Sequence, residues 1–594
     1  MTTQTVTRRY HPFWARRITG YFTVSDGTRL RYSALLPDAR GKFPAILKYS
    51  GYDTGSIGGE AYLDGNETFS VELDATLVAQ GYVVVGVSAR GTGCSEGQFD
   101  FLGHHYGEDG RDVVEQIASA DWCNGAVGMS GWSWAGMSQL ATAAQRPRGL
   151  RAIAPGATLG DPRRDSWAPG GVFAPAFASH WHDYLLDRWQ AVALSAVAED
   201  DHAGLEQLAR NRAALLAHSL PRYVITRQQS DAWQEQRALR KVTGDIAVPT
   251  LSFLAWQDEA VLSREGYYHE TLRPDLLWLV RTNGGHELYR SAHFHCTLVE
   301  FYDRFLKGNP DAFENQPRLE LWQDANAGKG ATTARDDRAV PGWTITLPQA
   351  DPCTVPRIWA LSGDGRLAAE GSATPQSRSY TYPVPGPDVN RDDDHDAWGA
   401  QPCGWREGSL AYTSVPLEAP LTTWGPASVD LWVAAENGPD ADLQVTLTEV
   451  LEDGREMYVQ RGWLRLSLRA LDEHHTTALR PWYIDRCESA APIYPNEPVF
   501  ARVEIVPFSH SFRRGSSLRL WLDTPSRTGG YGFDSISTPD RVTVLHDEAH
   551  PSRLVIGELP EVTVPNVRPD PATIFKQPLR TDPLRADLIV TSNT

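Results

Sequence analysis

Residues 126–136 read Ala-Val-Gly-Met-Ser-Gly-Trp-Ser-Trp-Ala-Gly, a short apolar run that leads into a tight turn. An alanine-rich stretch typical of a helix follows directly. Ser133 lies at the bend, where the backbones of strand and helix would nearly touch. The small residues that such a close approach requires are Gly131, Ala135 and Gly136. The segment therefore predicts a strand, a sharp turn and a helix with a serine at the apex, as in α/β-hydrolases.

The chain has 594 residues, too many for one hydrophobic core, so we expect about two to four domains. Its formal net charge of −18 argues against nucleic acid or an anionic membrane surface as a partner. No apolar run reaches the roughly 18 residues that a membrane helix needs. The basic residues near the N-terminus precede no apolar core, so no secretory leader is expected.

Six cysteines are scattered without a Cys-x-x-Cys pair, which indicates reduced thiols in a cytoplasmic protein and no zinc or redox motif. Cys123 lies near the serine turn but has no turn of its own, so we expect it to pack in the core. The acid-rich segment 391–396 lacks the spacing of a calcium loop, and we interpret it as a solvated loop. We expect neither a metal nor another cofactor.

The first part of the chain alternates buried apolar runs with helical patterns, which predicts a parallel α/β sheet. These patterns assign residues 1–154 and 249–342 to one domain. The expected elements are an antiparallel pair at 21–24 and 30–36, strands at 44–49, 82–87, 126–130, 150–154, 250–254 and 276–280, and a helix at 112–118.

The stretch 155–248 interrupts this sheet. It carries aromatic residues at helical spacing and then polar helices at 207–218 and 231–240. A helical insert between strands of a hydrolase sheet is expected to form a cap over the active site. A separate helical domain away from the site is the alternative.

Residues 343–594 have a different texture. Short alternating runs dominate and are separated by turn signals, which predicts a β-sandwich or jelly roll. A proline-rich tail after about 562 is expected to be extended. The expected strands are 428–434, 443–450, 463–468, 502–506, 517–522 and 541–545.

A serine nucleophile needs a base to remove its proton and an acid to orient that base. In α/β-hydrolases the order is Ser, Asp, His, each on a loop after a strand. Asp258 follows the strand expected at 250–254, and His286 follows the one at 276–280. The order therefore predicts a triad of Ser133, Asp258 and His286.

Other residues compete for two of these roles. Glu259 neighbours Asp258, so the order of residues favours Asp258 only mildly. Asp275 precedes its strand and would lie at the wrong edge of the sheet. His293 and His295 fall in the next expected helix, and we interpret them as structural.

These motifs resemble the cocaine esterase-like and X-prolyl dipeptidyl peptidase hydrolases (CocE/NonD), a family that includes cephalosporin acylases and α-amino acid ester hydrolases. The resemblance implies an α/β-hydrolase domain with an inserted helical cap and a C-terminal jelly-roll, galactose-binding-like β domain. The matching segments are Trp122–Gly136 around the serine, Arg90–Gly97, Trp256-Gln257-Asp258, His286, and 440–465 in the β-rich half.

The resemblance also implies an oxyanion hole made by the Tyr52 hydroxyl and the backbone N–H of Trp134. Two donors aimed at a developing alkoxide lower the barrier to acyl transfer. Gln257 and Trp134 each stand where the family has a tyrosine. Because these departures lie near the pocket, we expect Trp132, Gln257 and Trp181 to shape a substrate site that no relative's specificity describes.

The sequence thus predicts a serine hydrolase that cleaves an ester or amide of a small molecule through an acyl-enzyme. X-prolyl or dipeptidyl peptidase and β-lactam acylase activities remain alternatives. An acyltransferase using the same intermediate, or a binding protein on a relic hydrolase scaffold, are the other classes. A small molecule is the expected partner, and self-association into a homo-oligomer stays open.

Overall fold

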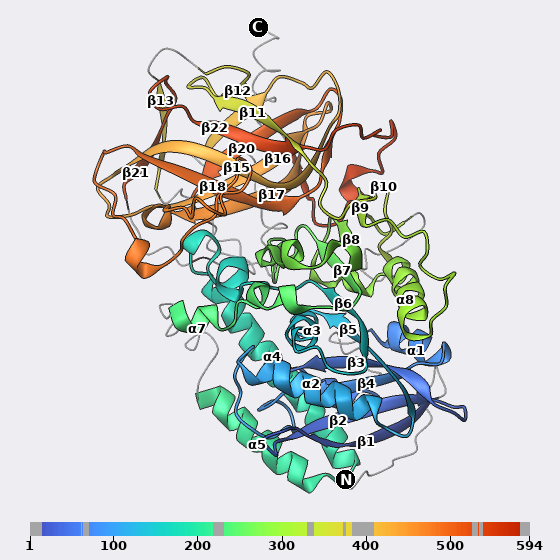
Figure 1. The fold of residues 1–594 in the computed structure, drawn as a ribbon. Coiled ribbons are helices and arrows are strands. Elements are labelled where there is room, and N and C mark those ends of the chain that lie inside the picture. The colour runs from blue at the N-terminus through green and yellow to red at the C-terminus, as the bar shows by residue number, and fades with distance from the viewer. Residues whose placement is uncertain are drawn as a thin grey trace.

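The computed structural model describes residues 15–60, 62, 70–217, 231–328, 338–371, 376–382, 409–525, 533 and 539–581. Figure 1 shows a β domain, coloured yellow to red, on one end of an α/β domain coloured blue to green. This confirms the predicted fold class. The acid-rich segment 391–396 lies outside the described residues.

The α/β domain is built on one mixed sheet of ten strands in the order β1-β2-β4-β3-β5-β6-β7-β8-β9-β10. From β4 to β9 neighbouring strands run parallel, while β1, β2 and β10 pair antiparallel at the edges. The strands are β1 Ala15–Thr23, β2 Arg29–Pro37, β3 Phe43–Ser50, β4 Val83–Ser88, β5 Cys123–Trp132, β6 Leu150–Gly156, β7 Thr250–Ala255, β8 Leu277–Thr282, β9 Leu319–Gln323 and β10 Trp343–Leu347.

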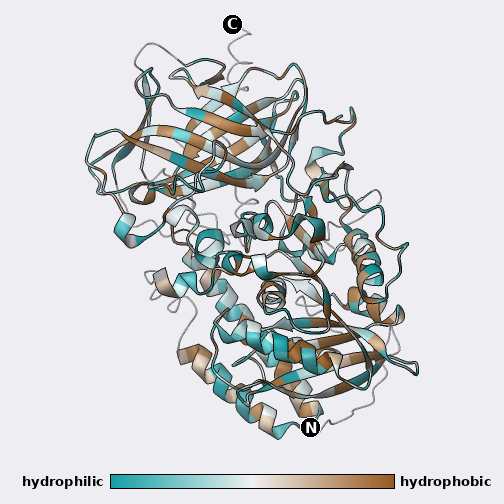
Figure 2. Ribbon diagram, viewed as in Figure 1, coloured by the Kyte–Doolittle hydropathy of each residue, from teal (hydrophilic) through white to brown (hydrophobic). Residues whose placement is uncertain are grey.

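Continuous apolar runs form the central strands because helices cover both faces of a parallel sheet. Every residue of β4 and of β7 is buried, and the central strands are largely brown in Figure 2. Cys123 is buried at the start of β5. The flanking helices are α1 Val71–Ala79, α2 His105–Ala118, α3 Trp134–Ala144 and α8 Ala292–Leu306.

One boundary differs from the prediction. Strand β10 pairs with β9 in the first sheet, from Trp343 opposite Gln323 to Leu347 opposite Leu319. The α/β sheet therefore extends through the 5 residues that were assigned to the β domain. The alternating pattern of β10 resembles that of the β domain because an edge strand has one exposed face.

A helical insert joins β6 to β7. Its helices are α4 Pro175–Ala198, α5 His202–Ala217 and α7 Asp231–Glu235. Asn211 of α5 donates to the carbonyls of Gly93 (2.9 Å) and Ser95 (2.8 Å), and Arg237 donates to the carbonyl of Phe101 (3.0 Å). The insert therefore packs on loops of the α/β domain rather than standing apart from it.

The β domain forms a sheet of 13 strands, nearly all antiparallel, in which β18 and β19 pair with β15 off the main path of neighbouring strands. The strand expected at 463–468 ends at Arg465, where the chain turns into a short 3₁₀ helix, Leu466–Leu468. The strands are β11 Val355–Leu361, β12 Arg366–Ala368, β13 Ser377–Thr381, β14 Leu410–Ser414, β15 Leu421–Glu436, β16 Asp442–Val450, β17 Arg455–Arg465, β18 Val499–Phe508, β19 Ser511–Phe512, β20 Ser517–Asp523, β21 Arg541–Leu545, β22 Arg553–Glu558 and β23 Leu579–Thr581.

A buried ion-pair network joins the two domains. The Arg264 guanidinium lies 3.0 Å from an Asp165 oxygen and 3.1 Å from a Glu504 oxygen. Tyr267 donates its hydroxyl to the same Glu504 carboxylate. Because both neighbours of Glu504 are buried, loss of this carboxylate would leave Arg264 with only one of its two carboxylates and Tyr267 without this acceptor.

We predict that Glu504→Ala destabilises the protein by about 3 kcal/mol, because a buried cation loses one of its two carboxylates and a buried hydroxyl loses its acceptor. Thermal and denaturant unfolding of the full chain should show the loss as a lower melting temperature. Asp364→Ala is the control, since its partner Arg366 is exposed, and it should cause no measurable shift. Equal shifts in the two variants would contradict a structural role for the network.

Candidate active site

Ser133 occupies the sharp turn between β5 and α3. Its backbone has φ 58° and ψ −131°, a left-handed conformation that is strained for a residue with a side chain. The Ser133 N–H lies 2.9 Å from the carbonyl oxygen of Gly156 and 3.1 Å from that of Ala157. These two carbonyls hold the strained turn in place and leave the side chain at its apex.

Small residues around the turn are required by contact. A Cβ on Gly131 would lie 2.7 Å from the Ala135 Cβ. A Cβ on Gly136 would lie 2.5 Å from the carbonyl oxygen of Gly156. Real Cβ atoms do not come this close to other atoms, so any larger residue would push the helix off the sheet.

Two hydrogen-bond donors lie beside Ser133. The Tyr52 hydroxyl, on the loop after β3, is 3.4 Å from the Ser133 Oγ. Trp134 is the first residue of α3, so its N–H has no acceptor within the helix. Trp181 of α4 also reaches this point, donating its indole N–H to the Tyr52 hydroxyl oxygen at 3.1 Å.

Asp258 and His286 form a buried pair on the loops after β7 and β8. The His286 Nδ1 lies 2.8 Å from one Asp258 carboxylate oxygen and 3.0 Å from the other. The N–H groups of Ala260 and Val261 each donate to Asp258 Oδ1 at 2.8 Å. The carboxylate is therefore fixed from the protein side and directs the Nδ1–H of the ring, which leaves Nε2 as the acceptor.

The charge of this pair raises the basicity of the histidine. Burial lowers the pKa of His286, but the Asp258 carboxylate and its hydrogen bond outweigh burial and raise that pKa to about 9. Glu259 adds a smaller contribution in the same direction and accepts the His286 backbone N–H at 3.1 Å.

Tyr289 connects the histidine loop to the serine turn. It lies one turn after His286 in a short 3₁₀ helix. Its hydroxyl donates to the Ala154 carbonyl at 2.9 Å and accepts the Gly131 N–H at 3.3 Å. In the described part of the chain, the Ser133 hydroxyl is hydrogen-bonded to Tyr52 and not to His286. The two halves of the site are thus held together through Tyr289.

A segment near the C-terminus supports the histidine loop. The Asn283 side-chain amide donates to the carbonyls of Ala325 and Phe575, both at 3.1 Å. The Phe575 N–H in turn donates to the Ala325 carbonyl at 3.0 Å. The loop that leads to His286 is therefore held by Phe575, which lies 292 positions after Asn283 in the chain.

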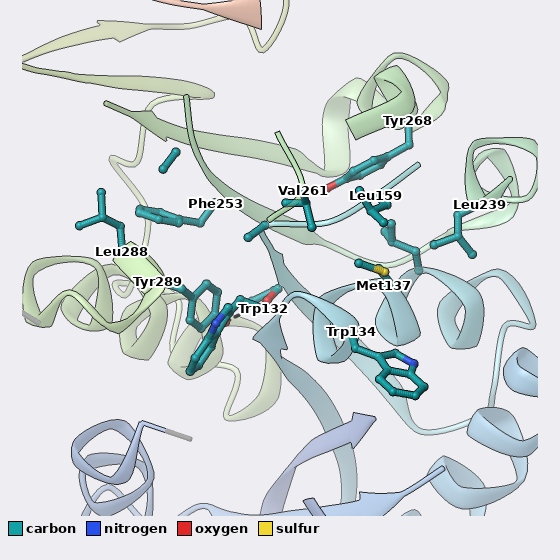
Figure 3. Packing of buried hydrophobic residues seen from close by; sticks show 14 of the residues in the cluster. Trp132, Trp134, Met137, Leu159, Leu239, Phe253, Val261, Tyr268, Leu288 and Tyr289 are labelled. Atoms are coloured by element: carbon teal, nitrogen blue, oxygen red, sulfur yellow. Dashed lines mark hydrogen bonds between the residues drawn. The ribbon is translucent and has the colours of Figure 1, made fainter. Parts of the chain in front are cut away.

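The two tryptophans beside Ser133 point in opposite directions (Figure 3). Trp132 stacks on Tyr289 with ring centroids 5.5 Å apart. Trp134 lies in an aromatic cluster with centroid distances of 5.4 Å to Tyr52, 5.2 Å to Phe101 and 5.3 Å to Trp181. Trp132 therefore lies on the side of the His286 loop and Trp134 on the side of Tyr52.

Gln257 links the loop of Asp258 to two other segments. Its side-chain amide donates to the Val459 carbonyl of the β domain at 2.8 Å and accepts the Gly284 N–H at 2.9 Å. The side chain is buried, and these hydrogen bonds hold the loops of Asp258 and His286 together. An amide side chain has both a donor and an acceptor, which suit the Val459 carbonyl and the Gly284 N–H.

Of the four competing residues, Glu259 lies beside His286, and the other three lie elsewhere. Asp275 is exposed and paired with Arg273. His293 and His295 both lie in α8, where His293 packs against Trp322 and burial lowers the pKa of His295 to about 4.

Sequence reasoning missed the groups that support the site. Trp189 of α4 donates its indole N–H to the Gly51 carbonyl at 2.8 Å, next to Tyr52. The helical spacing of the aromatic residues in 177–189 marked this face of α4 but not its target. Tyr289 carried a usable signal, because it lies one helical turn after the predicted histidine.

Within the described ranges, no group of three or more His, Cys, Asp or Glu side chains is placed to hold a metal ion. In the same ranges, no helix is long and apolar enough to cross a bilayer.

Two family models cover most of the chain. Residues 26–287 match the X-Pro dipeptidyl-peptidase (S15 family) model. Residues 313–555 match the model of the X-Pro dipeptidyl-peptidase C-terminal non-catalytic domain. The chain belongs to the CocE/NonD and X-Pro dipeptidyl-peptidase (S15) family of hydrolases. The resemblance inferred from its motifs is confirmed.

Relatives of this CocE/NonD hydrolase include the cocaine esterase of Rhodococcus sp. (strain MB1 Bresler), 26% identical over 505 residues that cover 75% of this chain and 82% of the relative. A CocE/NonD family hydrolase from Staphylococcus aureus has a TM-score of 0.70 at 18% identity and covers 92% of this chain and 94% of its own. An aminopeptidase from a marine sediment Thaumarchaeota archaeon has a TM-score of 0.68 at 17% identity, covering 93% and 99%.

This CocE/NonD hydrolase is therefore a serine hydrolase. The two structural matches, at low identity, show that the fold is shared along nearly the whole chain.

We predict that Asp258→Asn lowers kcat by about 10³- to 10⁴-fold, because the amide no longer selects the Nδ1–H form of His286. The same change removes the main charge that raises the pKa of His286. Activity of the wild type should rise with pH as His286 loses its proton, towards about 9. In the variant the rise should move to lower pH, as measured from kcat/KM profiles.

Glu259→Gln is the matched control for that profile. It removes a smaller charge beside His286 and keeps an oxygen to accept the backbone N–H. The rise of activity with pH should move only slightly towards lower pH, and kcat should stay within a few-fold of wild type. A larger shift in this variant than in Asp258→Asn would make Glu259 the acid partner.

Proposed function

We propose that this protein hydrolyses an ester or amide of a neutral small molecule through an acyl-enzyme on Ser133. The observation that carries the proposal is the Tyr52 hydroxyl 3.4 Å from the Ser133 Oγ, at the apex of a strained turn. A hydrogen-bond donor beside the nucleophile is placed to bind the oxyanion that develops when the nucleophile attacks. The ordered pair of Asp258 and His286 supplies the base.

In the first half of the reaction, Ser133 Oγ attacks the carbonyl carbon while its proton passes to Nε2 of His286. The carbonyl oxygen becomes an oxyanion that accepts hydrogen bonds from the Tyr52 hydroxyl and the Trp134 N–H. When the intermediate collapses, the bond to the alcohol or amine breaks. His286 gives its proton to that leaving group, and the acyl group stays on Ser133.

In the second half, water replaces the leaving group. Its oxygen attacks the acyl carbon, its proton passes to His286, and the same two donors hold the new oxyanion. Cleavage of the Ser133 ester releases the carboxylic acid and returns the proton from His286 to Ser133 Oγ. Asp258 keeps its negative charge throughout and stabilises the imidazolium that forms twice.

The surroundings of the serine favour an apolar acyl group. The rings packed on Trp134 and Tyr52 include those of Phe99, Phe101 and Trp181. Aromatic walls bind apolar and aromatic groups and offer no counter-charge to the ammonium of a peptide N-terminus. This supports ester or amide cleavage over a dipeptidyl peptidase, and the relation to a cocaine esterase points the same way.

We predict that a fluorophosphonate probe labels the wild type and fails to label Ser133→Ala, because only an activated serine reacts with it. Hydrolysis of p-nitrophenyl esters by the variant should fall by about 10⁴- to 10⁶-fold. Ser119→Ala removes an exposed serine of the same domain and should keep full labelling and activity. Normal labelling of Ser133→Ala would refute the assignment.

A substrate panel tests the acyl preference. We expect p-nitrophenyl benzoate and butyrate to be cleaved with higher kcat/KM than Xaa-Pro p-nitroanilides. The reverse order would assign a peptidase activity to the same serine. Faster product formation on addition of an alcohol or amine, with the acyl group found on the additive, would assign acyl transfer.

A further inference from the structure

The Tyr52 hydroxyl has a second contact besides Ser133. The Trp181 indole nitrogen lies 3.1 Å from the Tyr52 oxygen. An indole N–H can only donate, so the Tyr52 oxygen accepts this hydrogen bond. The proton of the Tyr52 hydroxyl therefore cannot point at Trp181. It is left free to point to the other side, where the Ser133 Oγ lies 3.4 Å away.

Packing fixes the direction of the Trp181 N–H. The Trp181 ring is buried and meets Phe101 edge-on at 5.0 Å and Trp134 at 5.3 Å between ring centroids. The Phe177 ring stacks on it at 6.4 Å with an interplanar angle of 9°. A ring held on these sides has little freedom to turn its donor away from Tyr52.

The same face of α4 also holds the loop that carries Tyr52. Trp189 donates its indole N–H to the Gly51 carbonyl at 2.8 Å. The Tyr184 ring meets the Tyr52 ring edge-on at 5.6 Å. Trp181, Tyr184 and Trp189 lie at helical spacing on one face of α4, so one helix of the insert sets both the loop and its hydroxyl.

We propose that Trp181 is a positioning residue that orients the Tyr52 hydroxyl as an oxyanion-hole donor, so that the helical insert completes the catalytic machinery. The inference rests on the proposed role of Tyr52 in acyl transfer. It gives Trp181 a task beyond that of a pocket wall: its N–H occupies one lone pair of the Tyr52 oxygen and directs the Tyr52 proton to the reacting oxygen.

An accepted hydrogen bond also makes the Tyr52 hydroxyl a better donor. Hydrogen bonds in a chain polarise one another, and the effect is larger in a buried site. Burial raises the pKa of Tyr52, while its hydrogen bonds with Ser133 and Trp181 act in the opposite direction. Trp181 thus offsets part of the effect that burial has on the acidity of this hydroxyl.

A double-mutant cycle tests the proposal on the full-length protein, with p-nitrophenyl acetate as a substrate whose small acyl group makes little contact with pocket walls. Trp181→Phe removes the N–H and keeps an aromatic ring. It should lower kcat about five- to tenfold with little change in KM, as expected for one hydrogen bond. Tyr52→Phe should lower kcat about 10²-fold. In the Tyr52→Phe background, Trp181→Phe should cost less than about twofold.

Two further variants separate the hydrogen bond from packing. Incorporation of 3-benzothienylalanine at position 181 replaces the N–H by sulfur and keeps the ring shape, and it should reproduce the loss seen in Trp181→Phe. Phe177→Leu loosens the stacking on Trp181 but keeps the N–H, and its loss should be smaller than that of Trp181→Phe. Full kcat with 3-benzothienylalanine would overturn the proposal.

The cycle distinguishes failure of this inference from failure of the proposed function. If Tyr52→Phe is impaired and Trp181→Phe costs the same factor in both backgrounds, Trp181 acts through packing and only its positioning role is refuted. If Tyr52→Phe and Ser133→Ala both keep wild-type kcat, the proposed function itself fails. Circular dichroism and melting temperatures of all variants show that each is folded.

Discussion

The near-contact of β5 and α3 at Ser133 is the constraint on which the site depends. The elements approach so closely that a side chain on Gly131 of β5 would collide with Ala135 of α3, and one on Gly136 of α3 with the Gly156 carbonyl of β6. The price is a strained conformation at Ser133 itself. The carbonyls of Gly156 and Ala157 and the hydroxyl of Tyr289 hold the turn in place, so the rest of the sheet stabilises a geometry that the turn could not keep alone.

Each part of the fold contributes to holding the candidate catalytic groups. The loop of Asp258 and the β domain exchange two hydrogen bonds. The Gln257 side chain donates to the Val459 carbonyl, and the Gln460 side chain donates to the Trp256 carbonyl, each at 2.8 Å. The insert holds the loop of Tyr52 through Trp181 and Trp189. A domain without a candidate catalytic residue of its own thus supports the geometry of the acid.

The features that could be predicted and those that could not differ in how far apart along the chain their contacting residues lie. Ser133, Asp258 and His286 follow from strand ends and from the order along the chain, and the central strands follow from continuous apolar runs. The pairing of strand β10 with the first sheet was not predicted, because edge strands alternate like those of the β domain. The supporting roles of Gln257 and Tyr289 were not predicted because each depends on a partner more than 100 residues away. The partner of Gln257 is Val459, 202 positions away, and the partner of Tyr289 is Ala154, 135 positions away.

The hydrogen bond of Asn283 with Phe575 has a consequence for folding during synthesis of the chain. A ribosome makes the chain from its N-terminus, so Ser133, Asp258 and His286 all emerge long before Phe575. The loop before the histidine lacks one of its acceptors until then. A growing chain can thus fold its sheet early, yet the loop before His286 gains this contact only after Phe575 has been made.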